Sequence, residues 1–295
     1  MPGSARRTAK WANGKTVPAL TRKPAEEPDV RYVAGMDVGT RTTRAVLLDE
    51  NGQQLASISR ETGARLEVAA QQTLEELCVR NGFDRNEIVY VASTGYGRYR
   101  VPFRQIQITE MTCHAVGALR LFPGTRTVLD VGAMNSRALR IAENGRVVAF
   151  KMNDRCASGA GRFLERVANS LEIELEEVGA LSLRSQDPQP ISSICAVLAE
   201  SEVINHVTAG KAVEDILRGA HNSIAERVVA LVRQVGAQPE ITVTGGVTRN
   251  RGMVAALEER LGGRVNVCAD SEYAGALGAA ILARQRWERL QAETK

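Results

Sequence analysis

An internal repeat constrains the fold of this chain more than any other feature. The segment "GMDVGTRTTRAVLLDENGQ", residues 35–53, aligns without a gap with "VLDVGAMNSRALRIAENGR", residues 128–146. The matched residues are Asp37 with Asp130, Gly39 with Gly132, Arg44 with Arg137, Asn51 with Asn144, and Gly52 with Gly145. A repeat of this length indicates that two halves of the chain share one structural plan.

Each copy predicts the same order of elements. An apolar strand ends in Asp-Val-Gly, a second strand follows, and an Asn-Gly pair then predicts a tight hairpin into a third strand. The first half continues with a helix near residues 66–80 and the strand "EIVYVAST". The second half carries a helical insertion at about 155–236, the strand "EITVTGG", and a further helix, strand and helix. We therefore predict an α/β fold of two similar lobes, residues 32–125 and 126–295, facing each other across a cleft.

The composition is that of an ordinary globular protein, with 295 residues, 44% of them hydrophobic and 24% charged. The net charge of +4 is too small to indicate a nucleic-acid partner. Residues 1–31 are basic and lack apolar periodicity, which predicts a disordered tail. No run approaches the ~20 apolar residues of a membrane span. We therefore expect a soluble, cytoplasmic protein with no membrane partner.

The two Asp-Val-Gly turns suit a nucleotide phosphate. Glycine lets the backbone approach a ligand, N–H and hydroxyl groups donate to phosphate oxygens, and aspartate holds Mg²⁺ through water. One copy alone would favour an ordinary hairpin with a structural aspartate, whereas two copies favour a clamp from both lobes. A third glycine turn, "VTGGVTRN", predicts an adenosine contact. The predicted catalytic residues are Asp37 and Asp130, and the predicted nucleotide-binding residues are Gly39, Thr40, Thr42, Thr43, Gly132, Asn135, Ser136, Gly245 and Gly246.

These turns resemble those of the acetate kinase, sugar kinase, Hsp70 and actin superfamily. The motifs "NDRCASGAGRFLE", "SICAVLAESEVI", "TGGVTRN" and "YAGALGAAILA" are more specifically similar to one ATPase family of that superfamily. Its members are activators of 2-hydroxyacyl-coenzyme A dehydratases and ATPase subunits of benzoyl-coenzyme A reductase. The resemblance runs from about residue 33 to the last helix. It implies duplicated actin-like (ribonuclease H-like) lobes, ATP with Mg²⁺, and low-potential electrons received from ferredoxin.

The five cysteines are dispersed without a CxxC motif. We expect Cys78, Cys113 and Cys268 to be small buried residues, the last at the end of a strand. Cys156 and Cys195 each precede a predicted helix, whose positive N-terminus favours the thiolate. The residues alone leave metal ligands, buried structural cysteines and a redox disulfide open. The resemblance implies that Cys156 and Cys195 bind a [4Fe–4S] cluster whose other two thiolates come from a second subunit.

The three histidines, His114, His206 and His221, show no metal-binding spacing, and we expect ordinary structural roles for them. The second turn reads "DVGAMNSRA", where family activators commonly carry Gly, Gln and Asp at the places of Ala133, Met134 and Asn135. An amide can neither act as a base nor replace a carboxylate on Mg²⁺. This departure predicts weakened ATP hydrolysis.

The segment "SSICAVLAE" resembles the D-type ATPase component of benzoyl-coenzyme A reductase. We therefore predict a subunit of a four-protein reductase that dearomatises an aromatic acyl-coenzyme A. Its partners would be an A-type ATPase subunit that shares the cluster, two acyl-coenzyme A-reducing subunits, and ferredoxin. The alternatives are a homodimeric dehydratase activator, a small-molecule kinase of the same superfold, and a non-catalytic nucleotide-binding partner.

Overall fold

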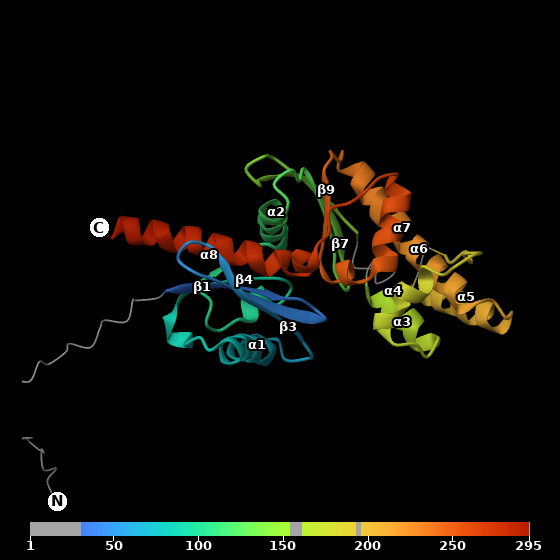
Figure 1. Ribbon diagram of the computed structural model, residues 1–295, viewed down its shortest axis with the longest axis horizontal. Helices are drawn as coiled ribbons and strands as arrows, with labels where there is room; N and C mark the ends of the chain where they lie inside the picture. The colour runs from blue at the N-terminus through green and yellow to red at the C-terminus, as the bar shows by residue number, and fades with distance from the viewer. Residues whose placement is uncertain (1–30, 154–160, 193–195, 295) are drawn as a thin grey trace, which may run out of the picture. The chain divides into compact units, whose positions relative to one another are not determined.

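Two β-sheets with the same strand order organise the computed structural model, which describes residues 31–153, 161–192 and 196–294 (Figure 1). In each sheet three antiparallel strands are followed by a parallel strand beside the first. The first sheet, ordered β3-β2-β1-β4-β5, contains β1 (Tyr32–Val38), β2 (Thr42–Leu48), β3 (Gln54–Glu61), β4 (Ile88–Thr94) and β5 (Ile106–Gln107). The second, ordered β8-β7-β6-β9, contains β6 (Thr127–Val131), β7 (Ser136–Ile141), β8 (Val147–Met152) and β9 (Ile241–Thr244). The repeat in the sequence is therefore a repeat of sheet topology.

The two Asn-Gly pairs form the hairpins that the sequence predicts. Gly52 has φ of 78° and Gly145 has φ of 79°, a left-handed conformation that glycine adopts without strain. The Gly52 N–H donates to the carbonyl of Asp49, and the Gly145 N–H donates to that of Ala142. These two turns set the pairing of β2 with β3 and of β7 with β8.

Two helices are exchanged between the sheets. Helix α2 (Glu110–Leu121) follows the first sheet in the chain but packs on the second, and helix α8 (Ala274–Glu293) ends the chain but packs on the first. The α2 contacts involve Ala115, Ala118, Val128, Leu139 and Ile141. The α8 contacts involve Ala276, Ala280, Val33, Val46 and Leu48. Each half of the chain therefore completes the core of the other half.

Small residues allow α2 and α8 to approach closely. A Cβ added at Gly117 of α2 would lie 1.9 Å from the Ala274 carbonyl oxygen, and one added at Gly278 of α8 would lie 1.9 Å from the Cys113 carbonyl oxygen. Each helix thus places a glycine against the backbone of the other. This crossing positions the first turn of α2 beside the ends of β1 and β6.

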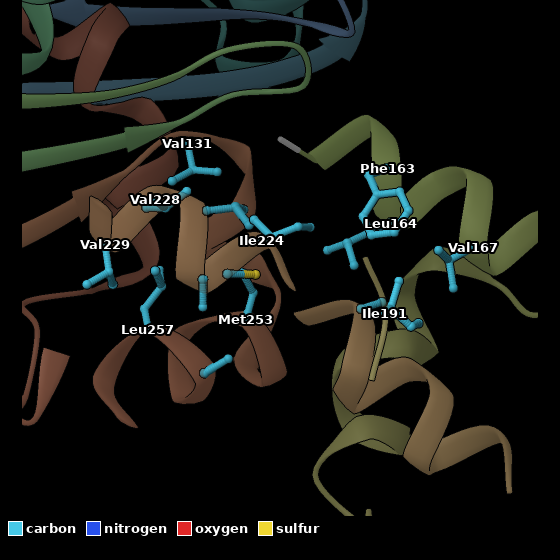
Figure 2. Close-up of a cluster of buried hydrophobic side chains, with 14 of the residues drawn as sticks. Val131, Phe163, Leu164, Val167, Ile191, Ile224, Val228, Val229, Met253 and Leu257 are labelled. Atoms are coloured by element: carbon cyan, nitrogen blue, oxygen red, sulfur yellow. The ribbon is translucent and has the colours of Figure 1, made fainter. Parts of the chain in front are cut away.

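The remaining helices pack on the outer faces of the sheets or on one another. Helix α1 (Leu66–Asn81) packs Leu74 and Leu77 against Met36 and Leu47 of the first sheet. On the second sheet lies α6 (Val213–Gln234), and α7 (Arg251–Leu261) packs beside it on α6. The helices α3 (Gly161–Ser170), α4 (Leu175–Ser182) and α5 (Ala196–Thr208) pack on these two helices and on one another. Figure 2 shows this core, in which Val131 of β6 lies near Ile224 and Val228 of α6 and Met253 of α7. Short 3₁₀ turns are η1 (Arg85–Glu87), η2 (Arg98–Arg100), η4 (Gly246–Arg249) and η5 (Ala269–Tyr273).

The prediction of a strand after α7 is wrong. Only Asn266 forms a bridge, to Thr242, because the chain turns at Cys268 into η5, where the Cys268 N–H donates to the Ser271 hydroxyl. Cys268 is consequently exposed rather than buried. The expected burial of Cys78 and Cys113 is confirmed.

Some predictions concern residues outside those that the structure describes. These are the tail (residues 1–30 of the predicted 1–31), Cys156 and Cys195. Among the described helices, none is long and apolar enough to cross a membrane.

Candidate functional site

Turns at the ends of four strands line one cleft with a volume of about 660 Å³, and three of these turns contribute a glycine to the lining. The Asp-Val-Gly turns follow β1 and β6, and Thr-Gly turns follow β4 and β9. The parallel pairing places Asp37 beside Thr94 and Asp130 beside Thr244. Each sheet therefore presents an aspartate turn and a threonine-glycine turn side by side, at the carboxyl ends of neighbouring parallel strands. Open α/β sheets bind ligands at this edge.

The two Asp-Val-Gly turns have the same backbone structure. The Gly39 N–H donates to the Thr42 carbonyl at 3.0 Å, and the Gly132 N–H donates to the Asn135 carbonyl at 2.9 Å. A Cβ at Gly39 would lie 2.8 Å from the Thr42 oxygen, so the turn needs glycine there. Because these two N–H groups are used within the turns, a ligand would be contacted by the other groups of the turn that line the cleft.

The Thr-Gly turn of the first sheet was not predicted from the sequence. Gly95 and Gly245 both have φ of 89°. A Cβ at Gly95 would lie 2.5 Å from Oδ1 of Asp37, and one at Gly245 would lie 2.7 Å from Oδ1 of Asp130. A signal for it exists in the sequence, because "STG" follows one strand as "VTG" follows the other.

Most of the predicted nucleotide residues line this cleft: Asp37, Gly39, Thr40, Thr42, Asp130, Gly132, Asn135, Gly245 and Gly246. The Oδ1 atom of Asn135 is buried and has no hydrogen-bond partner among the described residues, so it can accept a bond from a ligand or its water. Thr43 and Ser136 are fully buried and lie outside the lining. The hydroxyl of Thr43 bonds to that of Thr62 at 2.9 Å, which is a structural contact.

A buried ion-pair network holds Asp130 on the cleft floor. Nη1 of Arg137 donates to Oδ2 of Asp130 at 2.7 Å, and Nη2 of Arg137 donates to Oε2 of Glu110 at 2.7 Å. Burial raises the pKa of Glu110, and the charge of Arg137 opposes this. Burial acts to lower the pKa of Arg137, but Asp130 and Glu110 raise it overall. The guanidinium therefore stays charged between its two carboxylates.

His114, for which the sequence predicts only a structural role, lies between the two cleft aspartates. Its Nδ1 is 3.0 Å from the Thr244 hydroxyl and 3.6 Å from Oδ1 of Asp130. Its Nε2 is 3.9 Å from Oδ2 of Asp37. No spacing rule predicts this cluster, because α2 brings His114 to the cleft only through the helix exchange.

The cleft lining combines charged and apolar side chains. Arg41 contacts Glu61 at 2.7 Å and Glu165 of α3 at 2.8 Å, which ties the first sheet to the helical insertion. The bonds to these two carboxylates raise the pKa of Arg41. The apolar side chains of the lining include Leu164, Leu175 and Val247.

The combination of apolar walls with a few convergent polar groups is typical of small-molecule sites of this volume. Among the described residues, no group of three or more His, Cys, Asp or Glu side chains is arranged to hold a metal ion. A magnesium ion that arrives with nucleotide phosphates needs few protein ligands, because it keeps several waters.

The duplicated sheets define a fold of the actin and sugar-kinase type, with a cleft lined by glycine turns. The chain belongs to the BadF/BadG/BcrA/BcrD ATPase family, whose model matches residues 34–283.

Three comparisons illustrate the relationship. The chain is 39% identical to the 2-hydroxyisocaproyl-CoA dehydratase activator of Clostridioides difficile, over 90% of this chain and 99% of the relative. It is 38% identical to the D subunit of the benzoyl-CoA reductase of Thauera aromatica, over 87% of this chain and 94% of the relative. The solved structure of the activator of the 2-hydroxyisocaproyl-CoA dehydratase from Clostridium difficile, with bound ADPNP, matches with a TM-score of 0.85 and 38% identity. That match covers 90% of this chain and 98% of the other.

Proposed function

We propose that this protein is an ATP-dependent electron-transfer component that activates a partner acyl-coenzyme A enzyme. The observation that carries the proposal is the cleft, in which both sheets contribute an aspartate and a glycine turn. The names of its relatives support the role, because they include dehydratase activators and one component of a benzoyl-CoA reductase. ADPNP bound to one similar structure supports ATP as the nucleotide.

In this proposal the nucleotide phosphates lie near Gly39, Thr40 and Gly132, and the adenosine lies near Gly245 and Gly246. Ser136, which the sequence also predicts near the phosphates, follows the Gly132 turn with its side chain buried. Asp37 and Asp130 orient Mg²⁺ and the attacking water through their carboxylates. The ion neutralises phosphate charge when bound.

Cys156 and Cys195 are proposed as the ligands of a [4Fe–4S] cluster shared with a second subunit. This part rests on their sequence motifs and their places before two helices, since both lie outside the described residues. The cluster would supply one-electron transfer, with ferredoxin as donor and the partner enzyme as acceptor. The nucleotide can drive this transfer only through contacts that differ between its bound states.

The nucleotide site is tested with Asp37→Ala and Asp130→Ala, with exposed Glu226→Gln as a matched control. We expect the ATPase rate of each aspartate variant to fall at least about tenfold, which corresponds to ~1.4 kcal/mol of lost transition-state stabilisation. The control should keep the wild-type rate. An unchanged rate in both aspartate variants would exclude this site.

The cluster is tested by anaerobic purification with iron and sulfide analysis. We expect Cys156→Ala and Cys195→Ala to lose bound iron, because a missing thiolate leaves the cluster without its full ligand set. Cys268→Ala is the control, since this exposed cysteine has no proposed role. Full iron and sulfide in Cys156→Ala protein would show that the ligand assignment is wrong.

The partner is proposed to be a reductase that dearomatises an aromatic acyl-coenzyme A, with an A-type ATPase subunit completing the cluster. This choice rests on Met134 and Asn135, which line the cleft where a water-orienting amide and a carboxylate would support hydrolysis. A homodimeric dehydratase activator is the second candidate, favoured by relatives at 39%, 37% and 35% identity that carry activator names.

Expression of this chain alone without oxygen, followed by measurement of its native mass, distinguishes the reductase subunit from the homodimeric activator. Colourless or unstable protein that an A-type partner rescues supports the reductase. A stable brown homodimer with brisk ATP hydrolysis supports the activator.

A further inference from the structure

The two halves of the chain repeat in sequence, but their cleft aspartates have different ion-pair partners. The strand register places Arg44 opposite Asp37 and Arg137 opposite Asp130. Arg137 bonds its aspartate at 2.7 Å, whereas the Nε of Arg44 donates to Glu272 at 3.3 Å instead. Asp130 is therefore anchored by a buried guanidinium, and Asp37 lacks the equivalent anchor.

His114 meets the aspartates of both sheets. Helix α2 presents Glu110 and His114 one turn apart on the same face, where the first bonds Arg137 and the second contacts Asp130 and Asp37. The side chain of His114 is 6% exposed. Within the described residues, its imidazole is the only basic group within 4 Å of the Asp37 carboxylate. This one ring therefore spans the junction between the sheets.

A glycine in α8 keeps this contact open. A Cβ at Gly275 would lie 2.6 Å from Oδ2 of Asp37 and 2.8 Å from Nε2 of His114. Gly275 is the second residue of α8 and does not have a positive φ, so its backbone conformation does not require glycine. The space that glycine leaves is the space in which Asp37 and His114 approach each other.

We propose that His114 is a positioning residue that sets the spacing of the two cleft aspartates and thereby the affinity for metal-bound nucleotide. This inference rests on the proposed ATP–Mg²⁺ site. Asp130 is held by Arg137, and the His114 ring is fixed beside it by its bond to Thr244 at 3.0 Å. The other ring nitrogen lies 3.9 Å from Asp37, so the ring limits the positions that the Asp37 carboxylate can take relative to Asp130. Loss of the ring frees Asp37 to rotate. Metal-free ATP gains nothing from the two carboxylates, because its negative phosphates repel them. Loss of the His114 ring should therefore weaken the binding of the metal–nucleotide complex and not that of ATP alone.

The test compares His114→Asn with wild type in the full chain. Asparagine keeps an amide near the position of Nδ1 but does not reach Asp37. ATP binding is measured by calorimetry with Mg²⁺ and again with a chelator, and Mn²⁺–ATP binding is measured by electron paramagnetic resonance. We expect affinity for the metal complexes to fall about tenfold while metal-free ATP binding changes less than about twofold. The control His206→Asn, in α5 and outside the cleft lining, should match wild type in all three measurements.

Gly275→Ala provides a second variant that keeps both side chains but wedges a methyl group between them. Its control is Gly263→Ala, where an added Cβ meets nothing within 4 Å. The same metal-specific loss is expected for Gly275→Ala, including in the event that His114→Asn does not fold. Equal loss with and without metal, or no loss, overturns the inference. Wild-type protein that binds no nucleotide overturns the proposed function as well, whereas wild-type binding with unaffected variants overturns only the role of His114.

Discussion

At the scale of single residues, His221 in α6 is buried in an unusual way. It is fully buried, and neither ring nitrogen has a hydrogen-bond partner among the described residues. Burial, with a smaller contribution from the charge of Arg218, lowers its pKa to about 3. A Cβ at Gly252 would lie 2.9 Å from its Cε1, so the ring fills the contact between α6 and α7. The native protein therefore holds this imidazole neutral.

We predict that this residue makes the protein less stable as the pH falls from about 6.5 towards 3. In that window the unfolded chain binds a proton at His221 and the native state does not, so the free energy of unfolding falls by up to ~1.4 kcal/mol per pH unit. Urea unfolding of wild type and His221→Leu between pH 4.5 and 7 measures this. The stability of the variant relative to wild type should rise as the pH is lowered, whereas His206→Asn should show no comparable trend. A constant difference between wild type and His221→Leu across that range would contradict the prediction.

At the scale of elements, the α2–α8 crossing is the contact on which both sheets depend. Each helix approaches the backbone of the other at a glycine, Gly117 in α2 and Gly278 in α8. Gly278 approaches α2 at Cys113, next to His114, and both Glu110 and His114 line the cleft. The geometry of the cleft therefore depends on how closely the two helices can pack.

We predict that Gly278→Ala destabilises the protein by about 1–3 kcal/mol, because the new Cβ would lie 1.9 Å from the Cys113 carbonyl oxygen. The better helix propensity of alanine offsets part of this loss. Denaturant unfolding provides the measurement, with Gly263→Ala as a control that has open space around it. Wild-type stability in Gly278→Ala would show that the helices can separate without penalty.

At the scale of the whole molecule, the cleft draws residues from both sheets and from the helical insertion, so ligand binding and folding are linked. Arg41 to Glu165 and Arg44 to Glu272 join segments that are far apart in the chain. A nucleotide that contacts the turns of both sheets adds to these connections in the native state alone. Nucleotide binding should therefore raise the free energy of unfolding of the whole folded part of the chain.

We predict that ATP with Mg²⁺, at a hundred times its Kd, raises the free energy of unfolding by about 2.7 kcal/mol. For a chain of this length that corresponds to a rise in Tm of roughly 5 °C or more. Thermal unfolding followed by circular dichroism measures the shift, and Asp37→Ala should show a smaller one at the same concentrations. An equal shift with Mg²⁺ alone would point to a metal effect rather than nucleotide binding.

The local and periodic features of the fold can be predicted from the sequence. The aligned Asp-Val-Gly and Asn-Gly segments predicted both hairpins, the repeated sheet topology and most of the cleft residues, because turn chemistry depends on a few neighbouring residues. The burial of Cys78 and Cys113 followed from their places on helices. The burial predicted for Cys268 failed because a local capping turn ended the strand pattern early.

Long-range packing determines which helix completes which sheet and which side chains meet in the cleft. The repeat predicts equal roles for Arg44 and Arg137, yet one bonds Glu272 and the other bonds Asp130 and Glu110. Nothing local to His114 indicates that it faces two aspartates. These contacts join segments that are distant in the chain, so they depend on the close crossing of α2 and α8, and no periodic pattern in one segment can specify the packing of another.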